Sequence, residues 1–222
     1  MRVDIDRAIR AVHAAREFAW SWTVADLPAF AKAVGWTLVD FDRKYPRFIT
    51  NLAVNGPHTP VSIAVPPSPF PPGQLNRTGF NVTDVVLDVP EVKTAVDKAF
   101  DELVHQLFQT VQLRPTHSWT TPTRGLYWEF PHLVLEVTAS SRKVGVSLIN
   151  PAYLRRNEEM AEIARQEEED DWPSRHQVST RPPTARPGVD LRARQGRLVH
   201  LPADDATAAV RRGPPGRGRA PS

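Results

Sequence analysis

The hydrophobic pattern is clearest in residues 88–113, where apolar side chains recur at steps of three and four. These positions are Val92, Val96, Ala99, Phe100, Leu103, Leu107 and Val111. The spacing places them on one face of a helix and leaves the charged residues on the other faces. Asp88 is the expected N-cap and Pro90 suits the first turn, while Pro115 follows the end. The sequence predicts a long amphipathic helix over residues 89–113 that covers a sheet.

Two shorter helical patterns precede it. In residues 4–18 the apolar positions fit one face, and in residues 26–34 a second, shorter face follows with Pro28 in its first turn. Thr23 or Asp26 is the expected cap of the second helix. Gly35 directly follows it, at a position where a left-handed backbone conformation costs little free energy only for glycine.

Between these helices and the long one, we expect four strands. Apolar residues alternate in 48–54 and 61–65, residues 36–41 are β-branched and aromatic, and residues 80–87 are a further strand that leads into the long helix. Asn55-Gly56 predicts a hairpin between the second and third, because both residues tolerate positive φ, and Pro57 and Pro60 lengthen its loop beyond a two-residue turn. Residues 66–73 contain five prolines and are expected to form a stiff extended loop. The alternative is that this loop is a ligand for a proline-binding partner protein.

The C-terminal half alternates in residues 124–130, 133–139 and 144–149, with turn residues between them, which is typical of a three-stranded meander. Asn150 and Pro151 then start a charged helix that is expected to end near residue 170, frayed by five consecutive acids. The predicted fold is therefore α+β: an antiparallel sheet of two meanders, covered by the 89–113 helix, with N-terminal and C-terminal helices.

Charge divides the chain into two parts. The net charge is +3, but residues 172–222 hold ten arginines and three acids, so residues 1–171 carry −4. Residues 172–222 are also rich in proline and poor in large apolar side chains, which is typical of disorder. We expect a globular domain over residues 1–171 and a disordered tail over residues 172–222.

No motif in the chain names a reaction. The absence of cysteine excludes disulfides, thiolate metal sites and a cysteine nucleophile. The seven histidines show no metal-ligand spacing, and no phosphate-binding glycine motif or nucleophile elbow is present. The sequence therefore predicts a protein that is not an enzyme, with no cofactor and no metal. With no secretory signal and no apolar run long enough to span a bilayer, the expected location is the cytoplasm, without membrane association.

Aromatic residues are the best candidates for binding. Of six tryptophans, Trp20 and Trp119 lie at the ends of predicted elements. Together with Tyr127 they are the expected anchors for a partner protein, since aromatic side chains dominate interface energetics. The arginines of the tail, among them Arg211, Arg212, Arg217 and Arg219, are the second candidate. They would bind nucleic acid or an acidic surface, associate with the acidic helix end, or only solvate the chain.

The order of elements over residues 22–168, with an αβββαββα core, resembles the fold of type III secretion chaperones and YbjN-like proteins. The segment 22–30, followed by Val34-Gly35-Trp36, also resembles small actinobacterial α+β domains, some of them encoded near secreted toxins or type VII secretion substrates. These resemblances imply a non-enzymatic protein-binding module of immunity or chaperone type, whose partner is a secreted toxin or secretion substrate. The alternative is binding of nucleic acid or an acidic surface through the tail alone.

Overall fold

The structure is a computed structural model that describes residues 1–41, 45–66 and 68–176, with side chains described to residue 167. Its helices are α1 (Ile5–Glu17), α2 (Asp26–Val34), α3 (Pro90–Val111) and α4 (Pro151–His176). Its strands are β1 (Thr37–Val39), β2 (Arg47–Ile49), β3 (His58–Ile63), β4 (Leu75–Asn81), β5 (His117–Trp119), β6 (Arg124–Phe130), β7 (Leu133–Ala139) and β8 (Val144–Ile149).

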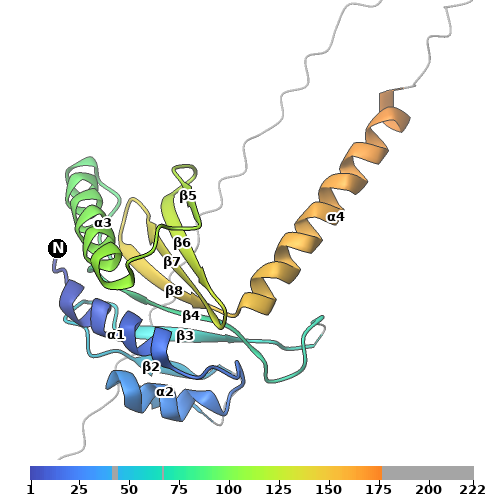
Figure 1. Cartoon of the computed structure of the whole chain (residues 1–222). Coiled ribbons are helices and arrows are strands. Elements are labelled where there is room, and N and C mark those ends of the chain that lie inside the picture. The colour runs from blue at the N-terminus through green and yellow to red at the C-terminus, as the bar shows by residue number, and fades with distance from the viewer. Residues whose placement is uncertain (42–44, 67, 177–222) are drawn as a thin grey trace, which may run out of the picture. The chain divides into compact units, whose positions relative to one another are not determined.

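The strands form one eight-stranded sheet in the order β1-β2-β3-β4-β8-β7-β6-β5, and every neighbouring pair is antiparallel. Each half of the chain contributes one meander, and the two meanders meet where β4 pairs with β8 (Figure 1). The predicted α+β fold with two antiparallel meanders is confirmed. The short edge strand β5 was not anticipated by the hydrophobic pattern.

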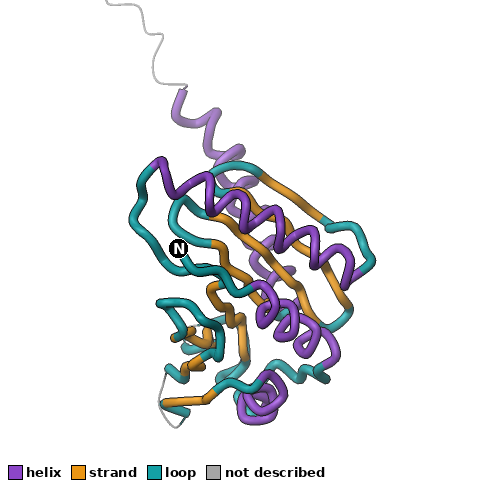
Figure 2. The backbone as a smooth tube through the Cα atoms, turned by 90° about the vertical axis from the view of Figure 1, so that its left-hand side faces the viewer, coloured by secondary structure: helices purple, strands orange, loops and turns teal. Residues whose placement is uncertain are grey.

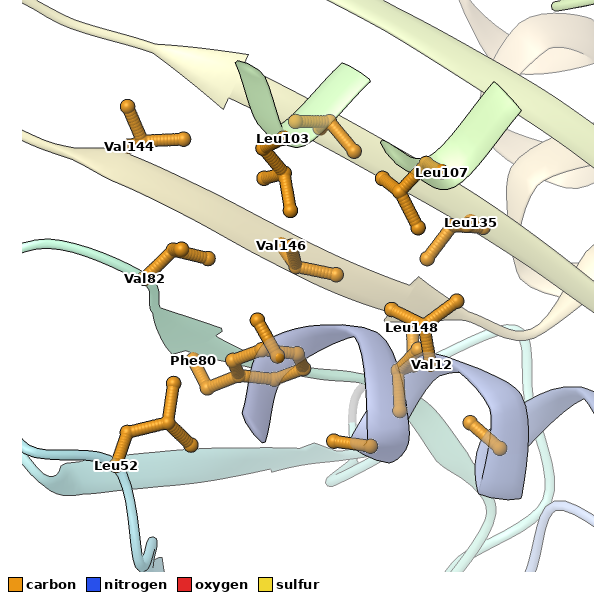
Figure 3. Packing of buried hydrophobic residues seen from close by; sticks show 14 of the residues in the cluster. Val12, Leu52, Phe80, Val82, Leu103, Leu107, Leu135, Val144, Val146 and Leu148 are labelled. Carbon is orange, nitrogen blue, oxygen red and sulfur yellow. The ribbon is translucent and has the colours of Figure 1, made fainter. Parts of the chain in front are cut away.

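Helices α1, α2 and α3 share one hydrophobic core with the sheet, and α3 lies over one face of it (Figure 2). Leu103 and Leu107 of α3 point toward the β8 and β7 side chains, while Val12 of α1 lies near Leu148 of β8 (Figure 3). All these side chains are buried. The prediction that the long helix covers the sheet is confirmed, and α1 and α2 extend that cover over the first meander.

The helix ends follow local chemistry. The Asp4 carboxylate accepts a hydrogen bond from the Arg7 N–H at 3.3 Å, and Gly35 ends α2 with φ +69°. The predicted cap at Asp88 is wrong, because α3 begins after Val89, which is extended and makes no side-chain cap bond. A residue before proline is biased toward extended geometry, so Pro90 forces the helix to start one residue later than predicted.

The first meander departs most from the pattern. The predicted hairpin forms, since β2 and β3 pair antiparallel, and its loop is long, running over residues 50–57. Neither Asn55 nor Gly56 has the positive φ that the prediction relied on. Asn55 instead pairs with Val85, since its Nδ2 donates to the Val85 carbonyl at 2.9 Å and its Oδ1 accepts from the Val85 N–H at 2.7 Å. Beyond β4, Val85 is thus bound to the loop after β2, and Thr83 forms an isolated bridge with Val3. Strand β4 spans residues 75–81 rather than the predicted 80–87.

Helix α4 is capped as predicted, because Asn150 Oδ1 accepts from the Ala152 N–H at 2.9 Å. Its first turn packs Tyr153 against Phe70, with ring centroids 5.6 Å apart, and every residue from 157 to 167 is exposed. The helix continues to His176, beyond the predicted end near residue 170. Glutamate favours helices, and pairs such as Arg156–Glu159 at 3.0 Å support the exposed turns.

The rest of the predicted tail, residues 177–222, lies outside the described residues, and with it Arg211, Arg212, Arg217 and Arg219. Among the described helices, none combines the length and the apolar content needed to cross a membrane.

Candidate functional site

The sheet has one face under α1–α3 and one face turned away from them, which we call the open face. In antiparallel pairs, residues directly opposite one another lie on the same face. The register therefore places on the open face two rows of side chains that cross from β4 to β5. One row is Gly79, Ser147, Glu136, Tyr127 and His117; the other is Asn81, Gly145, Thr138, Gly125 and Trp119.

A depression of about 380 Å³ opens on this face over β3, β4 and β8. Its floor lies at Gly79 and Gly145, where the two meanders meet. A Cβ on Gly79 would stand 2.7 Å from the Val146 carbonyl oxygen, so the strands approach too closely for any side chain there. A Cβ on Gly145 would have its nearest neighbour at 3.6 Å, an ordinary contact. The depression is thus the space that these two glycines leave unfilled.

The walls of the depression are polar and basic. Arg77 and Lys143 line it together with Ser62, Asn81 and Ser147, and no aspartate or glutamate does so among the described residues. Lys143 Nζ donates to Asn81 Oδ1 at 2.8 Å, and neither Arg77 nor Lys143 forms an ion pair within the described part of the chain. The depression therefore presents positive charge that no carboxylate of its own wall neutralises.

An aromatic patch, formed by His117, Trp119 and Tyr127, lies on the same open face at the β5 edge. The rings of His117 and Tyr127 stack at 5.6 Å, and those of Trp119 and Tyr127 lie 6.2 Å apart. His117 is exposed, and the other two are half-buried. Burial raises the pKa of Tyr127, and the negative charges of Glu129 and Glu158 raise it further. Acidic groups therefore lie beside this patch.

Gly125 holds Trp119 flat on the sheet. A Cβ at this position would come within 2.3 Å of the Trp119 ring. We expect Gly125→Val to lift the indole off β6 at a cost of about 1–3 kcal/mol in unfolding free energy, as for other overpacked sites. The measurement is the indole N–H resonance of Trp119 in a nitrogen–proton correlation spectrum, with urea denaturation in parallel. An unmoved resonance would contradict the assigned role of Gly125, and Gly145→Ala is the matched control.

The structure brings two of the three predicted anchors together and places the third elsewhere. Trp119 and Tyr127 share the aromatic patch, whereas Trp20 belongs to the connection between α1 and α2. Trp20 stacks on Trp22 at 4.6 Å, packs on Phe30, and donates from Nε1 to the Ala15 carbonyl at 2.9 Å. Its ring is half-buried in that aromatic group. Sequence position at the end of an element did not separate these two environments.

The residues of the depression were not singled out by sequence reasoning. The sequence analysis gave Gly79 and Gly145 no role, and Arg77 lies outside the predicted strand over residues 80–87. The available signal was the alternation of small and polar residues at 77, 79 and 81 and at 145 and 147. Among the described residues, no group of three histidine, aspartate or glutamate side chains is placed to share a metal ion.

Comparison with known proteins yields one match. The model of a family of unknown function, DUF6301, matches residues 6–150, which run from α1 through β8. No curated protein and no solved structure gives a significant match. The matched region contains the whole sheet, and with it the depression and the aromatic patch.

Proposed function

We propose that this chain, which belongs to the DUF6301 family of unknown function, is a non-enzymatic binding protein that receives a partner protein on its open face. The observation that carries the proposal is the depression between the two meanders, on the sheet face that α1–α3 leave free. The aromatic patch lies on that same face two strands away, because Gly145 aligns with Thr138 and Thr138 with Gly125.

Three physical features suit this face to partner binding. The strands that carry the depression, β3, β4 and β8, are paired on both sides, so little conformational entropy is lost when a partner docks there. Its depression has a volume within the usual range of about 300–1,000 Å³ for ligand sites. Its aromatic patch supplies the residue types that act as interface anchors. A standard interface of about 800 Å² per partner would span both the depression and the patch.

The proposed role is that of an immunity protein or secretion chaperone in the cytoplasm, with a secreted toxin or secretion substrate as its partner. Supporting it are the resemblance in element order noted above and the absence of cysteine, which fits a reducing compartment.

The decisive variant is Gly145→Leu. The added side chain enters the depression without backbone strain, because a Cβ there meets only ordinary contacts. We expect affinity for the partner to fall about tenfold or more, with little change in the melting temperature. The measurement is affinity capture from the native host's lysate with the full chain and its variants, quantified by mass spectrometry, followed by titration of the captured protein.

Gly145→Ala is the matched control, since one methyl group leaves the depression open. A partner retained by the wild type and by Gly145→Ala, and lost by Gly145→Leu, supports the proposal. Equal retention by all three baits would show that the depression is not used. A double variant, Trp119→Ala with Tyr127→Ala, then tests the aromatic patch, and unchanged capture by it would reject these two anchors.

A further inference from the structure

We infer that the depression takes an acidic segment of the partner, in extended conformation, with carboxylates four residues apart. This inference rests on the proposed function, because it specifies the chemistry received by the same face. Its first support is the charge of the wall. Arg77 is exposed and Lys143 half-buried; both line the depression, and neither has a carboxylate partner among the described residues.

The second support is the spacing of the two cations, measured in the direction of β4. Arg77 and Asn81 are four residues apart on one strand and face the same side, so their Cα atoms are separated by about 13 Å. Lys143 Nζ lies 2.8 Å from Asn81 Oδ1, which places the second cation at the Asn81 end. An extended segment laid along β4 presents its residues i and i+4 at this same spacing.

The third support is what lies between the cations. Gly79 and Gly145 leave a floor without side chains, and the hydroxyl groups of Ser62 and Ser147 border it. A small or polar residue at i+2 fits there and finds hydrogen-bond partners, whereas a large apolar one would leave those hydroxyls without water or partner. Two carboxylates at the ends would accept charge-assisted hydrogen bonds from Arg77 and Lys143, the stronger class of such bonds.

The acidic groups of the open face limit where such a segment can lie. Glu136 of β7 stands opposite Ser147 of β8, and Glu129 and Glu158 lie beside Tyr127. Carboxylates of a partner placed over β6 or β7 would meet like charges. The segment is therefore placed over β4, at the basic side of the face.

The test uses fluorescently labelled peptides of about twelve residues, alternating valine and serine, titrated against the full chain by fluorescence anisotropy. One peptide carries Glu at i and i+4, a second Gln at both positions, a third Lys at both, and a fourth Glu at i and i+3, which point to opposite faces of a strand. We expect the first to bind about tenfold or more tightly than each of the others, and its affinity to fall with added salt.

The variants Arg77→Gln and Lys143→Gln should each weaken the first peptide about tenfold and leave the Gln peptide unaffected. Arg10→Gln, an exposed arginine on α1, is the matched control and should change nothing. Binding of the Lys peptide equal to or tighter than that of the Glu peptide would overturn the inference. If the i,i+3 peptide binds as tightly as the i,i+4 peptide, the extended register is overturned.

Gly145→Leu separates this inference from the proposed function. If it abolishes binding of every peptide regardless of charge, the depression is the binding site and only the acidic specificity is wrong. If it affects none, the open face itself is rejected. Sedimentation of the full chain alone gives a further arm: a dimer lost in Arg77→Gln would identify the acidic α4 of a second copy as the occupant and would overturn the assignment to a partner protein.

Discussion

Replacing Trp128 by alanine is expected to lower the free energy of unfolding by about 3–5 kcal/mol, as in other large-to-small core substitutions. Trp128 is only 1% exposed and is the largest fully buried side chain of the described residues. Its Nε1–H donates to the Leu113 carbonyl at 3.0 Å, so it also fixes the chain just beyond α3. Alanine would leave both a cavity under the helix and an unpaired carbonyl.

Urea denaturation followed by circular dichroism measures this change. A domain of this kind is stable by only about 5–15 kcal/mol, so the variant should unfold at a clearly lower urea concentration. Trp119→Ala is the control, because this half-buried side chain contacts the sheet from the open face and its loss should cost less than half as much. Equal costs for the two variants would contradict the assignment of Trp128 to the core and Trp119 to the surface.

Asp84→Ala is expected to lower the free energy of unfolding by about 2–4 kcal/mol, because it leaves two backbone donors unpaired. The buried Asp84 carboxylate accepts from the Arg2 N–H at 2.8 Å and from the Asn55 N–H at 2.7 Å, joining the N-terminus to the loop after β2. Its ion pair with the Arg2 guanidinium, at 3.1 Å, contributes little, since that side chain is 61% exposed.

The contribution of Asp84 depends on pH. Burial raises the pKa of Asp84, but the hydrogen bonds from Arg2 and Asn55 outweigh it, so the folded pKa is lowered below the ordinary value of 3.8. A lowered folded pKa means stability that is fully present above the unfolded pKa and lost as pH falls through the folded pKa. We therefore expect the wild type to lose stability below about pH 4.

Denaturation of wild type, Asp84→Asn and Asp84→Ala at pH 7 and at pH 2.5 checks this expectation. The difference between wild type and each variant should shrink at the lower pH. Asp4 contributes its own pH dependence of stability to the wild type and to both variants. Burial raises the pKa of Asp4, and hydrogen bonds from Ala53 and Arg7 then lower it below the ordinary value. A difference that stays constant with pH would mean that the charge of Asp84 does not matter to the fold.

Local patterns were sufficient where each element carried its own boundary. Strands β6, β7 and β8 occupy the predicted residues 124–130, 133–139 and 144–149, because strict alternation is bounded there by turn residues. The end of α2 at Gly35 and the start of α4 at Asn150 followed from glycine and asparagine chemistry. The long amphipathic stripe similarly identified α3 and its buried face.

Boundaries were missed where a distant residue decides them. Asn55 was read with its neighbour Gly56 as a turn, but its partner is Val85, 30 residues away. Trp20 and Trp119 look alike in sequence, yet one packs among the aromatic side chains of the helices and the other lies on the open face. Neither difference is encoded in the few residues on each side of these positions.

By itself, the sequence determined the class of fold, the helix that covers the sheet and the strands of the second meander, because hydrophobic period and capping are local properties. Only the tertiary structure decided the candidate site. The pairing of β4 with β8 brings Gly79 next to Ser147 and Asn81 next to Gly145, and with them Lys143 to Asn81. These residues are more than 60 positions apart. The depression depends on that pairing, which places the two glycines at diagonal positions of neighbouring strands, where no side chain fills the space.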